Sequence, residues 1–188
     1  MATLFGSGIK RREDPRLITG SATYTDDVKL PGLTYAMFVR SPYAHAKVTS
    51  ISIEAAKNAP GVVAVYTGRD VKDALVPVPC AWNPPGCDLK VPPHPLLAYD
   101  KVRYVGDAVA MIVAESRAAA RDAVDLVEVE YDPLPATADP EKAAQPGAAQ
   151  LHPEVPNNIA FTWVVNGGDA EAAFNSAEVK VSQRIVQQ

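Results

Sequence analysis

The sequence lacks the features that would tie it to a membrane, to nucleic acid or to a disulfide-stabilised fold. Its longest apolar run, Ala108–Ala114, is far shorter than the ~20 residues that span a bilayer. The N-terminus has no apolar segment followed by a small-residue cleavage site. The 18 basic residues are scattered and the net charge is −4, which gives nucleic-acid binding little electrostatic support. With only Cys80 and Cys87 as cysteines, we expect a cytoplasmic protein with reduced thiols, no membrane span and no nucleic-acid partner.

Proline is present in excess, and its placement predicts two irregular connections. The 17 prolines gather between residues 77 and 95 and between residues 133 and 156. Because proline fixes φ and removes a backbone donor, both stretches are predicted to be extended or turning. The loop 76–95 spans about twenty residues without predicted secondary structure, which is longer than most connections in compact domains. Such loops are often functional, and this one places Trp82 among prolines.

The pattern between Leu33 and Tyr131 predicts alternating strands and short helices. The apolar run 108–113 is consistent with burial on both faces, and Ser116 is suited to cap the helix after it. This order indicates an α+β or α/β domain, and we favour an α+β domain with a mixed sheet and short helices. The predicted strands cover 34–40, 47–53, 62–67, 108–113 (approached through 101–106) and 127–131, and the predicted helices cover 54–59, 70–75 and 117–126.

A further unit follows a pattern-poor segment at residues 136–158. Asp169 is a plausible N-cap of its helix. Its last strand is followed by no turn residue or cap, so we expect that the polypeptide continues or that a partner chain completes the unit. The unit is predicted to contain a strand at 160–165, a turn at 166–168, a helix at 169–177 and a strand at 178–186.

Several short motifs follow one another along the chain. Together they resemble the large, molybdenum-binding subunits of the xanthine dehydrogenase, aldehyde oxidase and carbon monoxide dehydrogenase family, over essentially the whole chain. Glu13–Arg16 and the loop Pro85–Cys87 are more similar to bacterial carbon monoxide dehydrogenase-like members than to animal xanthine dehydrogenases. The motifs are Gly8–Gly20 with Ala22–Asp27 and Leu30–Gly32, Arg40–His45, Ala59–Val65, Val102–Ala110, and Val127–Tyr131 with Leu134–Pro135.

The resemblance implies a division of the chain and a chemistry for the whole enzyme. Residues 1–19 are predicted from their sequence to form an irregular, polar N-terminal arm. The resemblance implies an α/β-hammerhead domain at 20–135 and, after a linker at 136–158, the incomplete start of a molybdopterin-binding domain at 159–188. In the family, molybdenum on a pterin dithiolene hydroxylates an aldehyde or an N-heterocycle with oxygen from water, or oxidises carbon monoxide together with copper. The whole enzyme is implied to use molybdopterin in its cytosine dinucleotide form, 2Fe-2S clusters and FAD.

The family's catalytic motifs do not occur before Gln188. These motifs are a glycine-rich loop near molybdenum, a loop that carries the copper-binding cysteine, and a glutamate base. We therefore assign no catalytic, cofactor-binding or metal-binding residue and expect no cofactor in this chain alone. The expected role is a scaffold and interface part of a molybdenum-dependent oxidoreductase. The expected partners are the remainder of the large subunit, an iron–sulfur subunit and an FAD subunit. The alternative is a non-catalytic binding or assembly module that uses the hammerhead fold alone.

Some residues suggest sites of their own, and each also has a simpler structural explanation. Cys80, Cys87 and His94 have a spacing that fits none of the usual zinc patterns, so free loop thiols are favoured over a disulfide or a metal site. His45 titrates near neutrality and could act as a base, but a structural hydrogen bond is favoured. Asp26–Asp27 is expected to cap a turn rather than to bind a hard cation.

The remaining candidates lie in loops and on the arm. Gly106–Asp107 and Asn166–Gly168 lack the glycine spacing of a phosphate-binding loop. Arg11, Arg12 and Arg16 could pair bidentately with carboxylates on a partner surface, or could lie on a solvated arm. From its length and its exposed Trp82, we hypothesise that the loop 76–95 packs on the rest of the enzyme or lines the approach to its active site.

Overall fold

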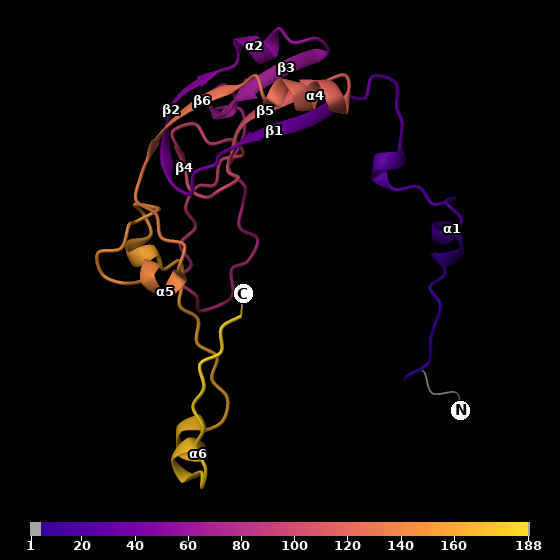
Figure 1. Ribbon diagram of the computed structural model, residues 1–188. Helices are drawn as coiled ribbons and strands as arrows, with labels where there is room; N and C mark the ends of the chain where they lie inside the picture. Colours follow the sequence, from indigo (N-terminus) through magenta and orange to yellow (C-terminus); the bar gives the residue numbers. More distant parts are fainter. Residues whose placement is uncertain (1–4, 188) are drawn as a thin grey trace.

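The computed structural model describes residues 5–187 and contains two small antiparallel sheets, which lie at the upper end of the molecule in Figure 1. All neighbouring strands are antiparallel, so the predicted mixed sheet is wrong. The first sheet has the strand order β1 (Tyr35–Arg40), β5 (Ala108–Ala114), β3 (Val62–Thr67). The second sheet has the strand order β4 (Lys101–Val102), β2 (Ala46–Ser52), β6 (Glu128–Pro133). No mixed sheet forms because the chain alternates between the two sheets, and because the parallel strands β1 and β3 are separated by β5.

Helix α4 (Arg117–Val124) covers one face of the first sheet, where it contacts β1 and β5. Ala120 and Ala123 have no exposed surface, because the small side chains let the helix approach the strands closely. The predicted cap is confirmed, since Ser116 Oγ accepts a hydrogen bond from the Ala119 amide at 3.1 Å. A shorter helix, α2 (Glu54–Lys57), occupies the predicted position before β3.

The core lies between α4 and the inner face of the first sheet and extends to the second sheet. Ala110 and Ile112 of β5 are completely buried on this face. Val109 points to the opposite face and is also fully buried, so the prediction of burial on both faces is confirmed at this end of the strand. Met111 is partly exposed, because the outer face is left open there.

Helix α3 (Gly68–Val71) begins two residues before the predicted helix 70–75. The amide and the hydroxyl of Thr67 both donate to Asp70 Oδ2 at 2.7 Å, and this capping box sets the helix start. A Cβ atom on Gly68 would lie 2.5 Å from the carbonyl oxygen of Leu97, so only glycine allows this close approach. The corner between β3 and α3 therefore holds the end of the proline-rich loop against the first sheet.

The loop 76–95 contains neither helix nor strand, as predicted. Two backbone hydrogen bonds nevertheless organise it. The Val78 amide donates to the carbonyl oxygen of His94 at 2.8 Å, which closes the loop at its base, and the Lys90 amide donates to the carbonyl oxygen of Ala160 at 2.9 Å. The second bond attaches the loop to the C-terminal part of the chain.

The pattern-poor segment 136–158 is ordered by hydrogen bonds, which its sequence did not indicate. It contains α5 (Pro140–Ala143) and a 3-10 turn at Pro156–Asn158. Asn158 adopts a positive φ of 57° and its side chain bonds three backbone groups. The side-chain amide donates to the carbonyl oxygens of Ala143 and Ala149, and the side-chain oxygen accepts from the Leu151 amide.

The two predicted C-terminal strands are wrong in this structure. Residues 160–165 and 178–186 pair with no strand in the described part of the chain. Alternating polar and apolar side chains favour an extended backbone, but a strand also needs a neighbouring strand to which it can hydrogen-bond. Between them, α6 (Ala170–Ser176) forms as predicted, and Asp169 caps it by accepting from the Ala172 amide at 2.9 Å. Figure 1 shows α6 at the far end of the molecule from the sheets.

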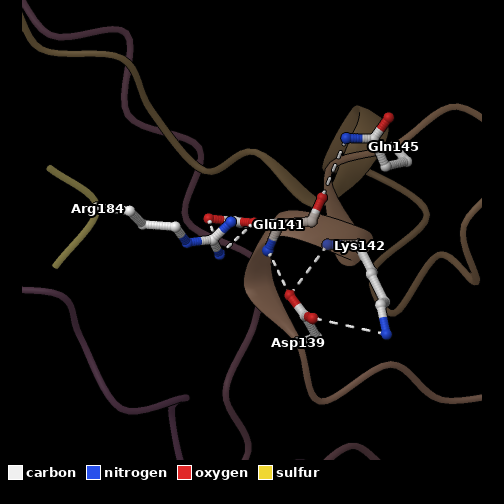
Figure 2. Close-up of polar contacts among 5 residues, drawn as sticks. All are labelled: Asp139, Glu141, Lys142, Gln145 and Arg184. Atoms are coloured by element: carbon white, nitrogen blue, oxygen red, sulfur yellow. Dashed lines mark hydrogen bonds and ion pairs between the residues drawn. The ribbon is translucent and has the colours of Figure 1, made fainter. Parts of the chain in front are cut away.

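An exposed ion pair holds the C-terminal segment to α5. Figure 2 shows one guanidinium nitrogen of Arg184 between the two carboxylate oxygens of Glu141, at 3.0 and 2.9 Å. Asp139 caps α5 by accepting from the amides of Glu141 and Lys142. Exposed pairs of this kind contribute little stability, about 0–1 kcal/mol. This ion pair therefore adds little to the stability of the C-terminal segment.

The predicted irregular arm contains one short helix, α1 (Asp14–Ile18), and stands apart from the sheets (Figure 1). Proline is favoured in the first turn of a helix, so Pro15 starts the helix rather than preventing it. Residues 1–4 of the predicted arm lie outside the described residues. No helix in the described part of the chain is long and apolar enough to cross a bilayer.

Candidate functional site

A pocket of 520 Å³ lies between the loop 76–95, the turn 103–107 and residues 151–160. We call it the loop pocket. Half of its lining residues are prolines, valines and leucines, and several polar side chains also line it. These polar residues are Cys80, Lys90, His94, Arg103, Tyr104, Asp107 and His152.

Asp107 anchors the turn that forms one wall of the loop pocket. Its side chain is 7% exposed, and one carboxylate oxygen accepts a hydrogen bond from the Arg103 amide at 3.0 Å. Burial, and secondarily the charge of Asp107, raise the pKa of Tyr104 above its ordinary value. The phenol therefore stays protonated near neutral pH, and it lies 3.4 Å from His94 Nε2. This pair supplies a polar contact at the wall of the loop pocket.

His45 has the structural role that was predicted for it. Its ring is 6% exposed, and Nδ1 lies 2.7 Å from the carbonyl oxygen of Pro135. Because a carbonyl oxygen only accepts, Nδ1 carries the proton of this bond. The other ring nitrogen, Nε2, is buried and has no hydrogen-bond partner in the described part of the chain. The same holds for Nε of Arg103.

His152 brings a third histidine to the same region. Burial, and then the positive charge of Arg103, lower the pKa of His152 below its ordinary value. His94 and His45 lower it further, whereas Glu154 opposes the shift. Two of these histidines, His94 and His152, line the loop pocket.

The other residues considered from the sequence have local roles. Cys80 and Cys87 are free thiols, as favoured, and Cys80 Sγ donates to the carbonyl oxygen of Trp82 at 3.3 Å. Asp27 caps its turn, because Oδ2 accepts from the Tyr24 amide at 2.9 Å. Asp26 pairs instead with Arg117 at 3.2 Å.

The loop and arm candidates do not gather into a site. Gly106 donates its amide to the carbonyl oxygen of Ser41 at 2.8 Å, so this amide is already used within the fold. Asn166–Gly168 forms the approach to α6. Arg11 pairs with Asp14 at 3.0 Å within the arm. Arg12 is exposed, and its part in an interface stays a prediction.

Trp82 belongs to an aromatic cluster that the sequence did not predict. Its ring centroid lies 4.7 Å from that of Phe161 and 6.0 Å from that of Trp163. The three residues remain 44%, 42% and 52% exposed. Nothing in the local pattern joins Trp82 to Phe161 and Trp163, because only the folded loop brings them together.

Comparison with known proteins identifies the fold and then the family. Residues 19–135 match the family model described as aldehyde oxidase and xanthine dehydrogenase, a/b hammerhead domain. The two antiparallel sheets with short helices are therefore an α+β hammerhead domain. The chain belongs to the molybdenum hydroxylase large-subunit family and corresponds to the N-terminal region that contains this domain.

Individual relatives cover nearly the whole chain. It is 41% identical to the nicotine 6-hydroxylase large subunit of Paenarthrobacter nicotinovorans, over 95% of this chain and 22% of the relative. It is 40% identical to the carbon monoxide dehydrogenase large chain of Afipia carboxidovorans, over 94% of this chain and 23% of the relative. The chain thus spans about a fifth to a quarter of the length of these relatives.

Solved structures show the same fold. The aldehyde oxidoreductase of Desulfovibrio gigas superposes with a TM-score of 0.75 at 31% identity, over 90% of this chain and 19% of that chain. The copper- and molybdenum-containing carbon monoxide dehydrogenase superposes with a TM-score of 0.69 at 41% identity, over 82% of this chain and 19% of that chain.

Residues 5–187, which the structure describes, contain no set of side chains that fits a molybdenum–pterin group. No group of three or more His, Cys, Asp or Glu side chains in the described residues could hold a metal ion. No glycine of the described residues lines the loop pocket, and one of its cationic side chains, Lys90, is paired with Asp88 at 3.1 Å. No step of molybdenum chemistry is therefore derived for these residues.

Proposed function

We propose that this chain is the N-terminal scaffold and interface part of a molybdenum hydroxylase large subunit. The aromatic cluster carries the proposal. Three large rings, each about half exposed, stand together on the loop 76–95 and residues 161–163. Tryptophan is enriched among the residues that dominate the binding energy of interfaces, especially within clusters that exclude water.

The C-terminal segments support an interface role. Val179, Val181 and Ile185 are 76%, 81% and 81% exposed and alternate along a segment that pairs with no described strand. An extended apolar segment gains hydrogen bonds and burial by adding to a sheet of another part of the protein. We propose that residues 159–188 begin a molybdopterin-binding domain that is completed beyond this chain, and that 136–158 connects it to the hammerhead domain.

The first sheet presents a second apolar surface. Phe38 of β1 and Tyr66 of β3 both pair with Met111 of β5, so the three side chains form one row on the outer face. Phe38 and Tyr66 are 40% and 41% exposed. Contiguous apolar patches of this kind mark interaction surfaces in soluble proteins. We assign this row to contact with the remainder of the large subunit.

The proposed enzyme oxidises an aldehyde, an N-heterocycle or carbon monoxide with molybdopterin held by the remainder of the large subunit. Electrons would pass through 2Fe-2S clusters to FAD on partner subunits or domains. This part of the proposal rests on family membership, since relatives are molybdenum-binding subunits and large chains of such enzymes. The role of this chain is to support and contact the remainder of the large subunit, which would hold the molybdopterin.

Replacing Trp82 by alanine in the assembled enzyme tests the proposal. Loss of a central aromatic residue should weaken association with the rest of the large subunit by about 2 kcal/mol, or roughly thirtyfold. Co-purification of molybdenum, iron and flavin measures the loss. Trp82→Phe should retain most of the association, because it keeps a ring beside Phe161.

Val76→Ala is the matched control, because Val76 lies on the same loop, is 80% exposed and takes no part in the aromatic cluster. It should leave assembly unchanged. Unaltered assembly and turnover with Trp82→Ala would contradict the proposed interface. Purification of the native protein as a lone monomer without molybdenum, iron or flavin would instead favour a non-catalytic module.

A further inference from the structure

An apolar groove lies against the outer face of the first sheet, beside α3. It consists of two adjoining hollows of 340 and 70 Å³, which we call together the sheet groove. Phe38 and Met111 line the larger hollow, so the groove continues the row that these two residues form with Tyr66. The residues that line both hollows are Val71, Leu75, Pro95, Leu96 and Leu97.

Contacts within the fold fix both walls of the sheet groove. The amides of Ala74 and Leu75 both donate to the carbonyl oxygen of Val71 at 3.0 Å, which holds the turn after α3. On the other wall, Leu97 is 4% exposed, and the absence of a side chain at Gly68 lets its backbone approach α3 closely. Because the walls are already ordered, a partner that enters the groove has little ordering cost to overcome.

The charged side chains that line the sheet groove are cationic. Lys72 lines the smaller hollow and Arg40 lines the larger one. No Asp or Glu among the described residues lines either hollow, and neither cation forms an ion pair in that part of the chain. Asp107 belongs to the wall of the loop pocket and accepts from the Arg103 amide. The groove is therefore complementary to an apolar partner that carries negative charge.

Arg40 is positioned to receive a carboxylate. One terminal nitrogen of its guanidinium donates to the carbonyl oxygen of Gly106 at 2.8 Å, and the guanidinium carbon lies 5.6 Å from the centroid of the Phe38 ring. A guanidinium has five N–H donors in one plane, so the bond to Gly106 leaves others for a bidentate pair with a carboxylate. Both contacts limit the rotation of the long side chain, which lowers the entropy cost of forming that pair.

We propose that the sheet groove binds an apolar segment of the remaining large subunit, and that an Asp or Glu side chain of this segment pairs with Arg40. The identity of the partner rests on the proposed function, which assigns the outer row to contact with the remainder of the large subunit. Apolar side chains of the segment contact Leu75 and Leu96, which are 47% and 49% exposed. Arg40 fixes the position of the segment, because its charge attracts a carboxylate and repels a lysine or an arginine.

Two capped peptides test this chemistry on the 188-residue chain. In extended acetyl-Leu-Ala-Leu-Ala-Glu-amide the leucines and the glutamate lie on one side, and the second peptide has glutamine in place of glutamate. NMR of the Arg40 Nε–H and the Met111 methyl group should show saturable binding of both peptides, about fivefold tighter for the glutamate peptide. Equal affinities would overturn the recognition of a carboxylate, and no saturation with either peptide would overturn the groove as a binding surface.

Arg40→Gln should remove the preference for the glutamate peptide, because it removes the charge and leaves the apolar walls intact. Its affinity for the glutamine peptide should stay within about twofold of that of the unaltered chain. Arg69→Gln is the matched control, because Arg69 is exposed on α3 and does not line the groove, and it should keep the preference. An equal loss in both variants would show a diffuse effect of charge and contradict the pair with Arg40. If Arg40→Gln does not fold, the comparison of the two peptides on the unaltered chain decides.

The assembled enzyme tests the identity of the partner. Phenylglyoxal modifies exposed guanidinium groups, and mass spectrometry should find Arg40 modified in the isolated chain and protected in the assembled enzyme. If assembly depends on Trp82 but Arg40 is modified as fully as in the isolated chain, the proposed function holds and this inference fails. A dimer of the isolated chain that is lost with Arg40→Gln would identify a second copy as the partner and would also overturn it. If no such enzyme forms, the proposed function and the named partner fail together, whereas the peptide titrations still decide whether the groove recognises a carboxylate.

Discussion

Gly68→Ala should destabilise the hammerhead domain, because a Cβ at this position has no room. It would lie 2.5 Å from the carbonyl oxygen of Leu97 and 2.8 Å from that of Ala98. Both contacts are with backbone, which is not free to rotate away as a flexible side chain is. Ala98 is 1% exposed, and its amide donates to the carbonyl oxygen of Ala108 at 2.7 Å, so this backbone is also held from its other side.

The magnitude follows from two opposing effects. Overpacking of a close-packed site costs about 1–3 kcal/mol, and contact with fixed backbone places Gly68→Ala near the upper value. Alanine is favoured over glycine in a helix and restricts the unfolded chain, which returns about 0.5–1 kcal/mol. The expected net loss is about 2 kcal/mol of the free energy of unfolding.

Urea unfolding followed by circular dichroism measures this loss. With an m value of about 2 kcal/mol per molar, the midpoint should fall by about 1 M while m stays constant. Gly167→Ala is the matched control, because no heavy atom lies within 4 Å of its added Cβ and its φ is not positive. It should change the free energy of unfolding by less than about 0.5 kcal/mol. Equal midpoints for the two variants would refute the steric reasoning.

Ser116→Ala should lower the free energy of unfolding by about 1 kcal/mol in the same assay, and Ser116→Asp should restore it, because aspartate also caps helices. Burial lowers the pKa of His152, so the unfolded chain takes up a proton at this residue more readily than the folded chain. The free energy of unfolding should therefore be independent of His152 above pH 6.5, its ordinary pKa, and should fall as the pH drops below that value. His152→Gln should flatten that part of the stability profile. The pKa of Asp70 is lowered by its bonds to Thr67, so its stabilising contribution is complete above pH 3.8 and is lost at lower pH. Asp70→Asn should remove that dependence.

Local features of the fold were predictable because they depend on neighbouring residues. Ser116 and Asp169 cap their helices as the sequence indicates, and the loop 76–95 is irregular because of its prolines. The start of α3 was missed because a Thr and an Asp three residues apart were not read as a capping box. That signal was available in the sequence.

The pairing of strands was not predictable from alternation alone. Alternation shows which residues share a face, but not which strand lies beside which. The expected mixed sheet became two antiparallel sheets, and residues 160–165 and 178–186 found no partner strand in the described chain. These segments have the side chains of strands and lack the neighbour that a strand requires.

The sequence by itself determined the family, the α+β class, the helix caps and the structural role of His45, because motifs and caps are local in the chain. Only the tertiary structure decided that Trp82 meets Phe161 and that the loop 76–95, the turn 103–107 and residues 151–160 surround one pocket. The physical reason is that contacts between distant residues depend on register and on the path of a long loop. No local pattern encodes either of them.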